Sequence, residues 1–304
     1  MDYLWKTGYR AEIERCSNMY RHFKDGAGYI RAVFEGLESY FDQSDQNLPI
    51  QNMLQVAPDE TLNTTDLMKK DSSLRLQPPV NQQLFIDLFR LSCEQTVKSN
   101  PNLEQIMEQV TGKVEEFIYH SEEELHLHTL KLLMASLVKE TSIGQDMATF
   151  LFSIILSSIY RQQFENIRKV VRIDLYEGGD CPLCGERPHY GYLRQDDGAK
   201  VLDCWLCGTQ WAHNRVKCPY CNNEEREELG YFTVEGIDVC RVNYCHRCRQ
   251  YCKIIDARNF NLDSSLILAI HNLASLGHDL LARKEGFSAG SGLEWVNEEE
   301  LSER

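Results

Sequence analysis

The sequence predicts an α+β protein in which a helical N-terminal domain precedes a cysteine-rich region of short strands and a C-terminal helix. Three observations indicate this order. Apolar residues recur at helical spacing through residues 1–172, Gly, Cys and Pro then punctuate short apolar segments over residues 173–258, and a leucine-rich periodic stretch occupies residues 259–286. A chain of 304 residues is long enough for about two domains.

Two amphipathic helices are expected within residues 6–43, divided near Gly26 and Gly28, because apolar side chains recur there at helical spacing. Residues 43–83 are rich in Gln, Asn, Asp, Ser and Pro and lack sustained periodicity. This composition predicts a long polar connection inside the helical domain, with at most one short helix.

Later helix starts carry capping signals. Asn100 is a good N-cap for a helix with Pro101 at its first position, and Ser121 with Glu124 has the spacing of a capping box. A longer helix is expected from about residue 144 to residue 171.

Past the cysteine-rich region, the helix at residues 259–286 is expected to pack on the body of the protein. The remaining residues, 287–304, read as an acidic, solvated tail.

Charge and compartment narrow the function classes. The formal net charge of −14 repels phosphate backbones, and residues 175–258 hold 13 acidic against 11 basic side chains, so a nucleic-acid-binding ribbon is disfavoured. The N-terminal residues show no signal-peptide pattern, so we expect the protein to stay in the cytosol. Clustered cysteines in that compartment are metal ligands or redox groups. The longest apolar run, residues 147–160, is shorter than the roughly 18 residues of a membrane span.

Four Cys-x-x-Cys pairs within 68 residues are the strongest chemical signal in the chain. Such a turn presents two thiolates to one side, and two turns complete a tetrahedral site for zinc or iron. Spacers of 19 and 23 residues favour sequential over interleaved pairing, since each sequential site closes a shorter loop. The eight candidate metal ligands are Cys181, Cys184, Cys204, Cys207, Cys218, Cys221, Cys245 and Cys248.

Residues beside these turns have expected roles as well. Gly185, Gly208 and Asn222 each follow a pair, where a positive φ is needed. Cys240 and Cys252 are expected to be small strand residues that bind no metal. Eight well-spaced cysteines also leave no ligand position for the nearby His189, His213 and His246.

No catalytic machinery is recognisable. A tetrahedral ion with four protein ligands has no open position for water or substrate. The sequence also contains neither a phosphate-cradling glycine loop nor a nucleophile elbow. We therefore expect no catalytic residue and no enzyme activity.

The order of these motifs resembles the formate dehydrogenase accessory protein family, FdhE. The matching segments are CPLCGERP, CWLCGTQWAHNRVKCPYC, NYCHRC with CKIIDAR, and the helix LILAIHNLASLGHDLLARKEGF, which together span about residues 180–287. The resemblance implies a cytosolic assembly chaperone that binds the catalytic subunit of formate dehydrogenase before export. It also implies rubredoxin-like iron sites at the eight paired cysteines. The ligands alone fit two metal ions, iron or zinc, in two tandem rubredoxin-like or zinc-ribbon-like modules.

Two other functions compete with this interpretation. The protein could be an iron-dependent thiol or electron-transfer protein, or a nucleic-acid-binding zinc ribbon with contacts from Trp205, Tyr220 and Arg247. A self-association surface on the helical half, giving a homo-oligomer, is a further alternative to burial of the apolar faces in the protein's own core.

Overall fold

The chain divides into two units, which are described separately. The computed structural model describes residues 9–20, 23–44, 75–121, 124–171, 173, 176–259 and 265–290. Among these, the first unit takes the residues up to 27, residues 75–76 and those from 160 onward, and the second unit takes 28–44 and 77–159. Most of the predicted polar connection and of the acidic tail lies outside the described residues.

The second unit is helical in its described part. Three phenylalanines form the centre of its core, since the rings of Phe85, Phe89 and Phe152 lie 5.5 to 5.9 Å apart and are almost wholly buried. None of the helices in the described ranges combines the length and apolarity that a bilayer crossing requires. The helices that contribute to this unit are α2 (Phe23–Ser44), α4 (Gln82–Ser99), α5 (Glu104–Tyr119), α6 (Leu127–Glu140) and α7 (Gln145–Gln163), of which α2 and α7 continue into the first unit.

Capping explains one helix start and not another. The side chain of Asn100 accepts a hydrogen bond from the Asn102 amide at 3.3 Å and opens a short 3₁₀ turn that leads into α5, as predicted. The predicted capping box at Ser121 is wrong, because α6 begins only at Leu127. Leu125 is instead engaged in a β-bridge, in which its carbonyl accepts from the Val80 amide at 2.7 Å.

Three other predicted boundaries differ from the structure. The first two helices are α1 (Tyr9–Met19) and α2, so Gly26 and Gly28 lie inside a helix, where an added Cβ would meet nothing within 4 Å. The expected helix over 144–171 is interrupted at Phe164 and continues as α8 (Glu165–Val170). The expected C-terminal helix is divided at Ser275 into α9 (Ser265–Ala274) and α10 (Leu276–Lys284).

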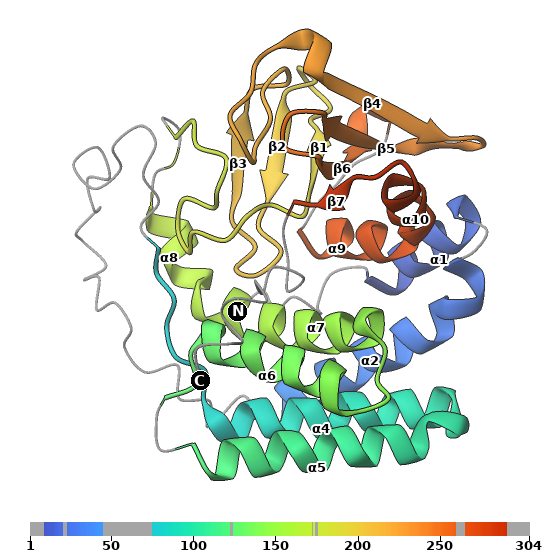
Figure 1. The fold of residues 1–304 in the computed structure, drawn as a ribbon, viewed down its shortest axis with the longest axis vertical. Coiled ribbons are helices and arrows are strands. Elements are labelled where there is room, and N and C mark those ends of the chain that lie inside the picture. Colours follow the sequence, from blue (N-terminus) through green and yellow to red (C-terminus); the bar gives the residue numbers. More distant parts are fainter. Residues whose placement is uncertain are drawn as a thin grey trace. The chain divides into compact units, whose positions relative to one another are not determined.

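The first unit contains a seven-stranded sheet with the order β3-β2-β1-β6-β5-β4, in which β7 also pairs with β6 (Figure 1). Strands β1 to β3 form one antiparallel set and β4 to β6 another. The two sets are joined by parallel pairing of β1 with β6, from Tyr190 opposite Lys253 to Leu193 opposite Asp256. The strands are β1 (Tyr190–Leu193), β2 (Lys200–Asp203), β3 (Gln210–His213), β4 (Leu229–Val234), β5 (Ile237–Cys245), β6 (Gln250–Asp256) and β7 (Ser288–Ala289).

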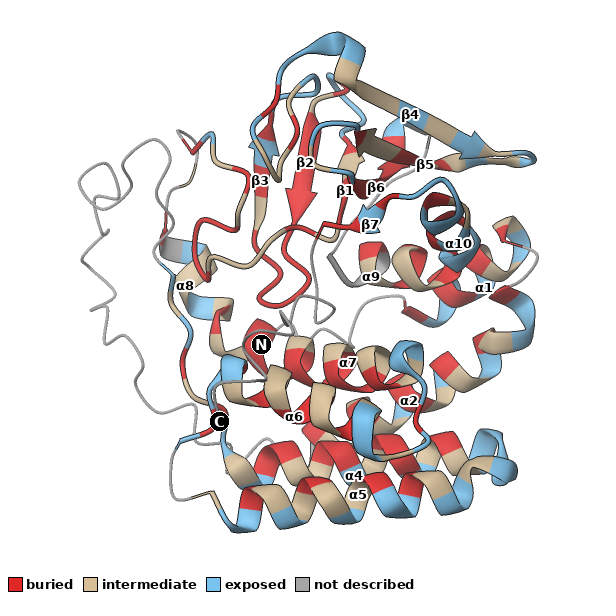
Figure 2. Ribbon diagram, viewed as in Figure 1, coloured by how far each residue is buried: buried red, intermediate tan, exposed pale blue. Residues whose placement is uncertain are grey.

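Burial in this sheet is greatest in β2 and β6. All four residues of β2 and six of the seven residues of β6 are buried (Figure 2). Helix α10 covers part of the sheet through an apolar cluster that includes Val242, Tyr251, Ala282 and Phe287. Helix α9 packs against α1, where the Tyr20 hydroxyl lies 3.1 Å from Nδ1 of His271.

A buried ion pair fixes α10 to β6. Lys253 Nζ lies 2.6 Å from Asp279 Oδ2 and donates to the Asn272 carbonyl at 2.8 Å, while the Tyr251 hydroxyl donates to Asp279 Oδ1 at 2.8 Å. The Lys253 side chain is 1% exposed and that of Asp279 10%. Each charge is therefore both paired and hydrogen-bonded, which is the condition under which burial of charges is tolerated.

Replacing Lys253 by methionine is expected to lower the free energy of unfolding by about 3 to 5 kcal/mol, because the Asp279 carboxylate stays buried without its counter-charge. Urea denaturation measures the change. Adding Asp279→Asn to the same chain should restore part of the stability. The matched control is Lys169→Met, which removes an exposed pair with Glu165 at 2.8 Å and should cost less than about 1 kcal/mol. Equal losses for the two lysine variants would contradict the prediction.

Candidate metal centres

Each Cys-x-x-Cys pair forms a knuckle in which the carbonyl of the first cysteine accepts a backbone hydrogen bond, and the first three knuckles are closed by a second one. In the first, the Gly185 amide donates to the Cys181 carbonyl at 3.0 Å, and the Cys181 amide donates to Glu186 at 2.7 Å. The turn requires a left-handed residue directly after the second cysteine. Gly185, Gly208 and Asn222 hold this position with φ of 79°, 71° and 58°, which confirms the prediction made for them.

The fourth knuckle has an arginine at the left-handed position. Arg249 adopts φ of 59°, and its amide donates to the Cys245 carbonyl at 2.9 Å. Its guanidinium lies 4.4 Å from the ring centroid of Phe287 and donates to the Glu285 carbonyl at 3.1 Å, which offsets the strain of a non-glycine residue there. Sequence reasoning missed Arg249, although its place in the internal repeat is the same as that of Gly185 and Gly208.

The first pair of knuckles brings four sulfur atoms together. Cys181 Sγ lies 3.5 Å from Cys207 Sγ, and Cys184 Sγ lies 3.4 Å from Cys204 Sγ. A tetrahedral ion with metal–sulfur bonds of about 2.3 Å separates its ligands by about 3.8 Å, whereas a disulfide bond is about 2.05 Å long. The spacing therefore fits a four-thiolate metal site, which we call cluster 1, and all four cysteines are buried.

The second pair of knuckles repeats this geometry. Cys218 Sγ lies 3.7 Å from Cys248 Sγ, and Cys221 Sγ lies 3.7 Å from Cys245 Sγ. We call these four residues cluster 2. The structure thus groups the eight cysteines sequentially, which decides between the two pairings that the spacing left open. Unlike cluster 1, cluster 2 is open to solvent on one side, because Cys221 and Cys248 are only half-buried.

The protein environment alone disfavours four thiolates in cluster 1. Burial raises the pKa of Cys184 and of Cys204 well above the ordinary value of a thiol. The pKa of Cys207 is lowered instead, because hydrogen bonds from the other cysteines and Thr209 outweigh its burial. A bound divalent or trivalent cation reverses the preference of Cys184 and Cys204 for the protonated form, because a coordinated thiol is deprotonated outright. Cluster 1 is therefore suited to four thiolates only around a metal ion.

Two arginines from the helices hold the second knuckle of cluster 1. Arg161 of α7 donates to Asp203 Oδ1 at 3.2 Å and to the Cys204 carbonyl at 3.3 Å, and Arg168 of α8 donates to the Cys207 carbonyl. Asp203 directly precedes Cys204, and burial raises its pKa to about 6 although Arg161 opposes the shift. Sequence reasoning did not single out these residues, because their partners lie 39 to 43 positions away.

The remaining cysteines and histidines near the knuckles lie outside both clusters. Cys240 is in β5 and Cys252 is in β6, which agrees with the expectation of small strand residues. Cys252 Sγ contacts the His189 carbonyl at 3.8 Å, and His213 Nδ1 lies 3.0 Å from the Asn214 carbonyl. Asn223 Nδ2 points to Cys245 Sγ at 3.8 Å and steadies a sulfur of cluster 2.

A third group of ligand-type side chains lies between α1 and α9. Glu12, Cys16 and His271 are buried, and their ligand atoms lie within 4.8 Å of one another. Glu12 Oε1 is 2.7 Å from His271 Nε2, which is shorter than the roughly 3.4 Å that separates nitrogen and oxygen ligands of a tetrahedral ion at bond lengths of about 2.1 Å. The group is better explained as a buried pair that fixes α1 to α9.

Comparison with known proteins points to one family. The model of the FdhE central domain matches residues 180–215. The chain is 30% identical over 195 residues to the "Protein FdhE homolog" of Aquifex aeolicus (strain VF5), covering 62% of this chain and 65% of that protein. It is 30% identical over 154 residues to "Protein FdhE" of Salmonella paratyphi A (strain ATCC 9150 / SARB42), covering 49% and 48%. The matches thus span between about half and two thirds of the length of these relatives.

The fold itself has a solved counterpart. The crystal structure of the FdhE protein from Pseudomonas aeruginosa matches 93% of this chain and 92% of its own, with a TM-score of 0.53 and 16% identity. At this identity the match supports the fold alone. The fold includes the helical region followed by the sheet region that holds both clusters, as the sequence predicted.

Proposed function

We propose, on the premise that this chain belongs to the FdhE family, that it is a cytosolic accessory protein which binds the catalytic subunit of a formate dehydrogenase during maturation, before export. The two four-cysteine clusters are the observation that carries this proposal. Four protein ligands close the coordination sphere of a tetrahedral ion, so the sites suit folding and docking rather than turnover.

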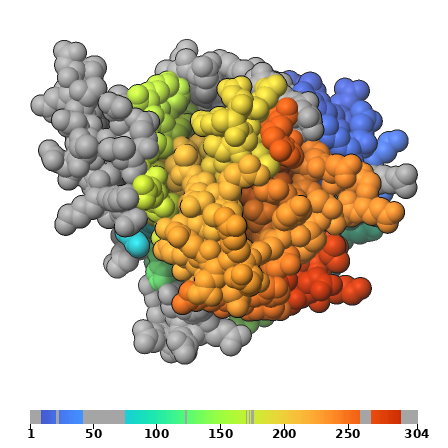
Figure 3. Space-filling model, turned by 90° about the horizontal axis from the view of Figure 1, so that it is seen from above, coloured from blue at the N-terminus to red at the C-terminus, as the bar shows by residue number. Residues whose placement is uncertain are grey.

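Cluster 2 is the part of the site best suited to contact a partner protein. Its Cys221 and Cys248 are half-buried, whereas the cysteines of cluster 1 are covered. In Figure 3 the two antiparallel sets, coloured yellow to orange, form one continuous surface. We propose that cluster 1 stabilises the module and that the knuckles of cluster 2 form part of the docking surface.

The ligands of the two ions are proposed to be the eight paired cysteines. Zinc would supply a purely structural link between knuckles, whereas iron would add a one-electron couple. The exposure of Cys221 and Cys248 favours electron transfer as the second candidate function, because an electron donor could approach cluster 2 closely. Anaerobically isolated protein with only zinc and no redox response would exclude that second function.

The docking proposal predicts that Cys221→Ser abolishes co-purification with the formate dehydrogenase catalytic subunit and leaves the helical unit folded. A tagged form of this protein, expressed with the untagged catalytic subunit, provides the assay, and metal analysis reports which ion is lost. The matched control is Cys252→Ser, which alters a buried thiol of β6 outside both clusters and should preserve binding. Undiminished co-purification by a folded Cys221→Ser protein that lacks the second ion would refute the metal-dependent proposal.

A further inference from the structure

A basic pocket lies beside cluster 2, between the face of β4, β5 and β6 and the segment that leads to Cys218. Its volume is about 320 Å³. Five basic side chains line it, and no aspartate or glutamate is among the lining residues in the part of the chain that the structure describes. The basic residues are Lys200, Arg215, Lys217, Arg226 and Arg241.

This concentration of positive charge is produced by the fold. Along the sequence, residues 175–258 hold 13 acidic and 11 basic side chains, and the whole chain has a net charge of −14. Nearly half of those basic residues nevertheless line one cavity. A charge count along the chain therefore conceals a site with a strongly positive local potential.

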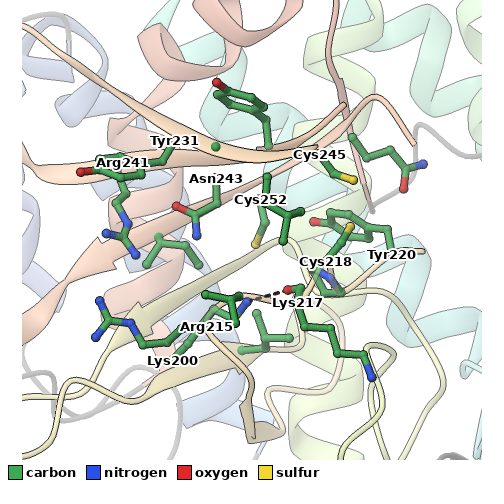
Figure 4. A pocket seen from close by; sticks show the side chains of 18 of the residues that line it. Lys200, Arg215, Lys217, Cys218, Tyr220, Tyr231, Arg241, Asn243, Cys245 and Cys252 are labelled. Carbon is green, nitrogen blue, oxygen red and sulfur yellow. Dashed lines mark hydrogen bonds between the residues drawn. The ribbon is translucent and has the colours of Figure 1, made fainter. Parts of the chain in front are cut away.

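Three of the cations converge inside the pocket (Figure 4). Arg241 and Asn243 point from β5 toward Arg215, and Lys200 reaches in from β2. Lys200 is 3% exposed. One of the three N–H groups of its ammonium donates a hydrogen bond to the Lys217 carbonyl at 3.0 Å. The Arg241 guanidinium lies 4.9 Å from the ring centroid of Tyr231. The geometry leaves further donors of Lys200 and Arg241 available to a ligand.

The pocket also contains unsatisfied polar atoms. Arg241 Nε and Asn243 Oδ1 are buried without a hydrogen-bond partner among the described residues. The Arg215 side chain forms no ion pair or hydrogen bond with any described residue. Buried donors and acceptors are nearly always satisfied in native proteins, by protein groups or by water or a ligand. These atoms are therefore candidates for direct contact with a bound molecule.

The arginines of the pocket are not placed to neutralise the thiolates of cluster 2. In Figure 4, Arg215 and Arg241 lie at the opposite end of the pocket from Cys218 and Cys245. Burial and the charge of Arg215 lower the pKa of Arg241, whereas the negative charge of Asp256 raises it. Asp256 is itself bound to Arg258, whose Nε donates to it at 2.7 Å. The arginines thus face one another with little negative charge from the protein.

We propose that this pocket binds a phosphorylated small molecule, with its phosphate oxygens held by Lys200, Arg215 and Arg241. A phosphate group carries up to two charges and three terminal oxygens, which suits convergent arginines and a lysine. The volume lies at the lower end of the roughly 300 to 1,000 Å³ typical of ligand pockets, so the ligand is small. The net charge of −14 repels a polyanion such as RNA.

Isothermal titration calorimetry with inorganic pyrophosphate and with ADP tests the proposal on the full-length, metal-loaded protein. Saturable binding is expected, and Arg241→Gln should weaken it at least about tenfold, because the variant loses a charge-assisted hydrogen bond to the phosphate. The matched control is Arg194→Gln, which changes an exposed arginine paired with Asp197 outside the pocket and should leave binding unchanged. Both variants should retain the metal content of the parent.

Several outcomes would overturn the proposal. Absence of binding by both probes would do so, as would equal affinity of the Arg241→Gln and parent proteins. Equal or tighter binding of a tri-glutamate peptide would assign the pocket to carboxylates of a protein partner instead. The calorimetric titration does not depend on the co-purification assay. A negative result in the titration would therefore overturn the phosphate-binding proposal and leave the docking proposal unaffected.

Discussion

Cys184→Ser is expected to release one metal ion from cluster 1 and to unfold much of the sheet that the knuckles organise. Cys184 is buried, its Sγ lies 3.4 Å from Cys204 Sγ, and no other cysteine is within the group to replace it. Structural thiolate sites contribute on the order of 10 kcal/mol of apparent folding free energy. Metal analysis should therefore fall from two equivalents to one or fewer, and thermal unfolding should begin at a much lower temperature.

Cluster 2 supplies the comparison for this prediction. Cys221→Ser removes a half-buried ligand, so it should also cost one ion while the region around cluster 1 keeps its fold. Cys252→Ser, which changes a buried thiol outside both clusters, should keep both ions. Full metal content and parental stability in Cys184→Ser would show that cluster 1 is not a metal site.

Arg161→Met is expected to destabilise the protein by about 3 to 5 kcal/mol at neutral pH, because Asp203 remains fully buried without its cation. The Asp203 carboxylate would keep a neutral hydrogen-bond donor, Gln210 Nε2, at 2.9 Å. Equilibrium unfolding in urea, followed by circular dichroism, measures the loss. A second substitution, Asp203→Asn, should recover part of it.

The pH dependence of that loss gives a sharper test. Asp203 has a folded-state pKa of about 6, above its ordinary value, so the folded state binds the proton more tightly than the unfolded state does. The contribution of Asp203 to the free energy of unfolding consequently falls as pH rises from about 4 toward 6. Removing Arg161 raises the folded-state pKa further and extends the fall to higher pH. The loss of unfolding free energy caused by Arg161→Met should therefore become smaller as the pH is lowered from 7.5 to 5.5.

Its matched control is Arg194→Met, in which an arginine with a 47% exposed side chain is changed in the same way. Little change in stability is expected at any pH, because exposed ion pairs contribute little. A pH-independent deficit in Arg161→Met would instead assign the loss to packing of the arginine stem and not to the Asp203 charge.

Sequence reasoning was most successful where the chemistry is local. A Cys-x-x-Cys turn contains within about five residues both its ligands and the left-handed residue that closes it, so Gly185, Gly208 and Asn222 could be assigned from spacing alone. The sequential grouping of the cysteines was likewise favoured by loop length, although the spacing did not exclude interleaving.

Predictions failed where distant contacts overrule local preference. Ser121 and Glu124 have the spacing of a capping box, but Leu125 pairs with Val80, which lies 45 positions earlier, and the helix starts later. Gly26 and Gly28 are weak helix formers, yet both lie within α2. The convergence of Arg215 and Arg241 could not be seen either, because alternation along β5 and the pairing of strands determine which charges share a face.

The parallel pairing of β1 with β6 has a consequence for the order of events during synthesis. Each knuckle pair and its hairpin can form as soon as its own segment leaves the ribosome, since the four cysteines of each cluster and the strands between them are close in sequence. The parallel pairing of β1 with β6 joins Tyr190 to Lys253, which lies 63 residues later, and therefore requires both halves of the repeat. Closure of a long loop is entropically costly and slow. Metal loading of the first half can therefore precede closure of the sheet, and the half-formed sheet exposes the edge of β1 until the second half arrives.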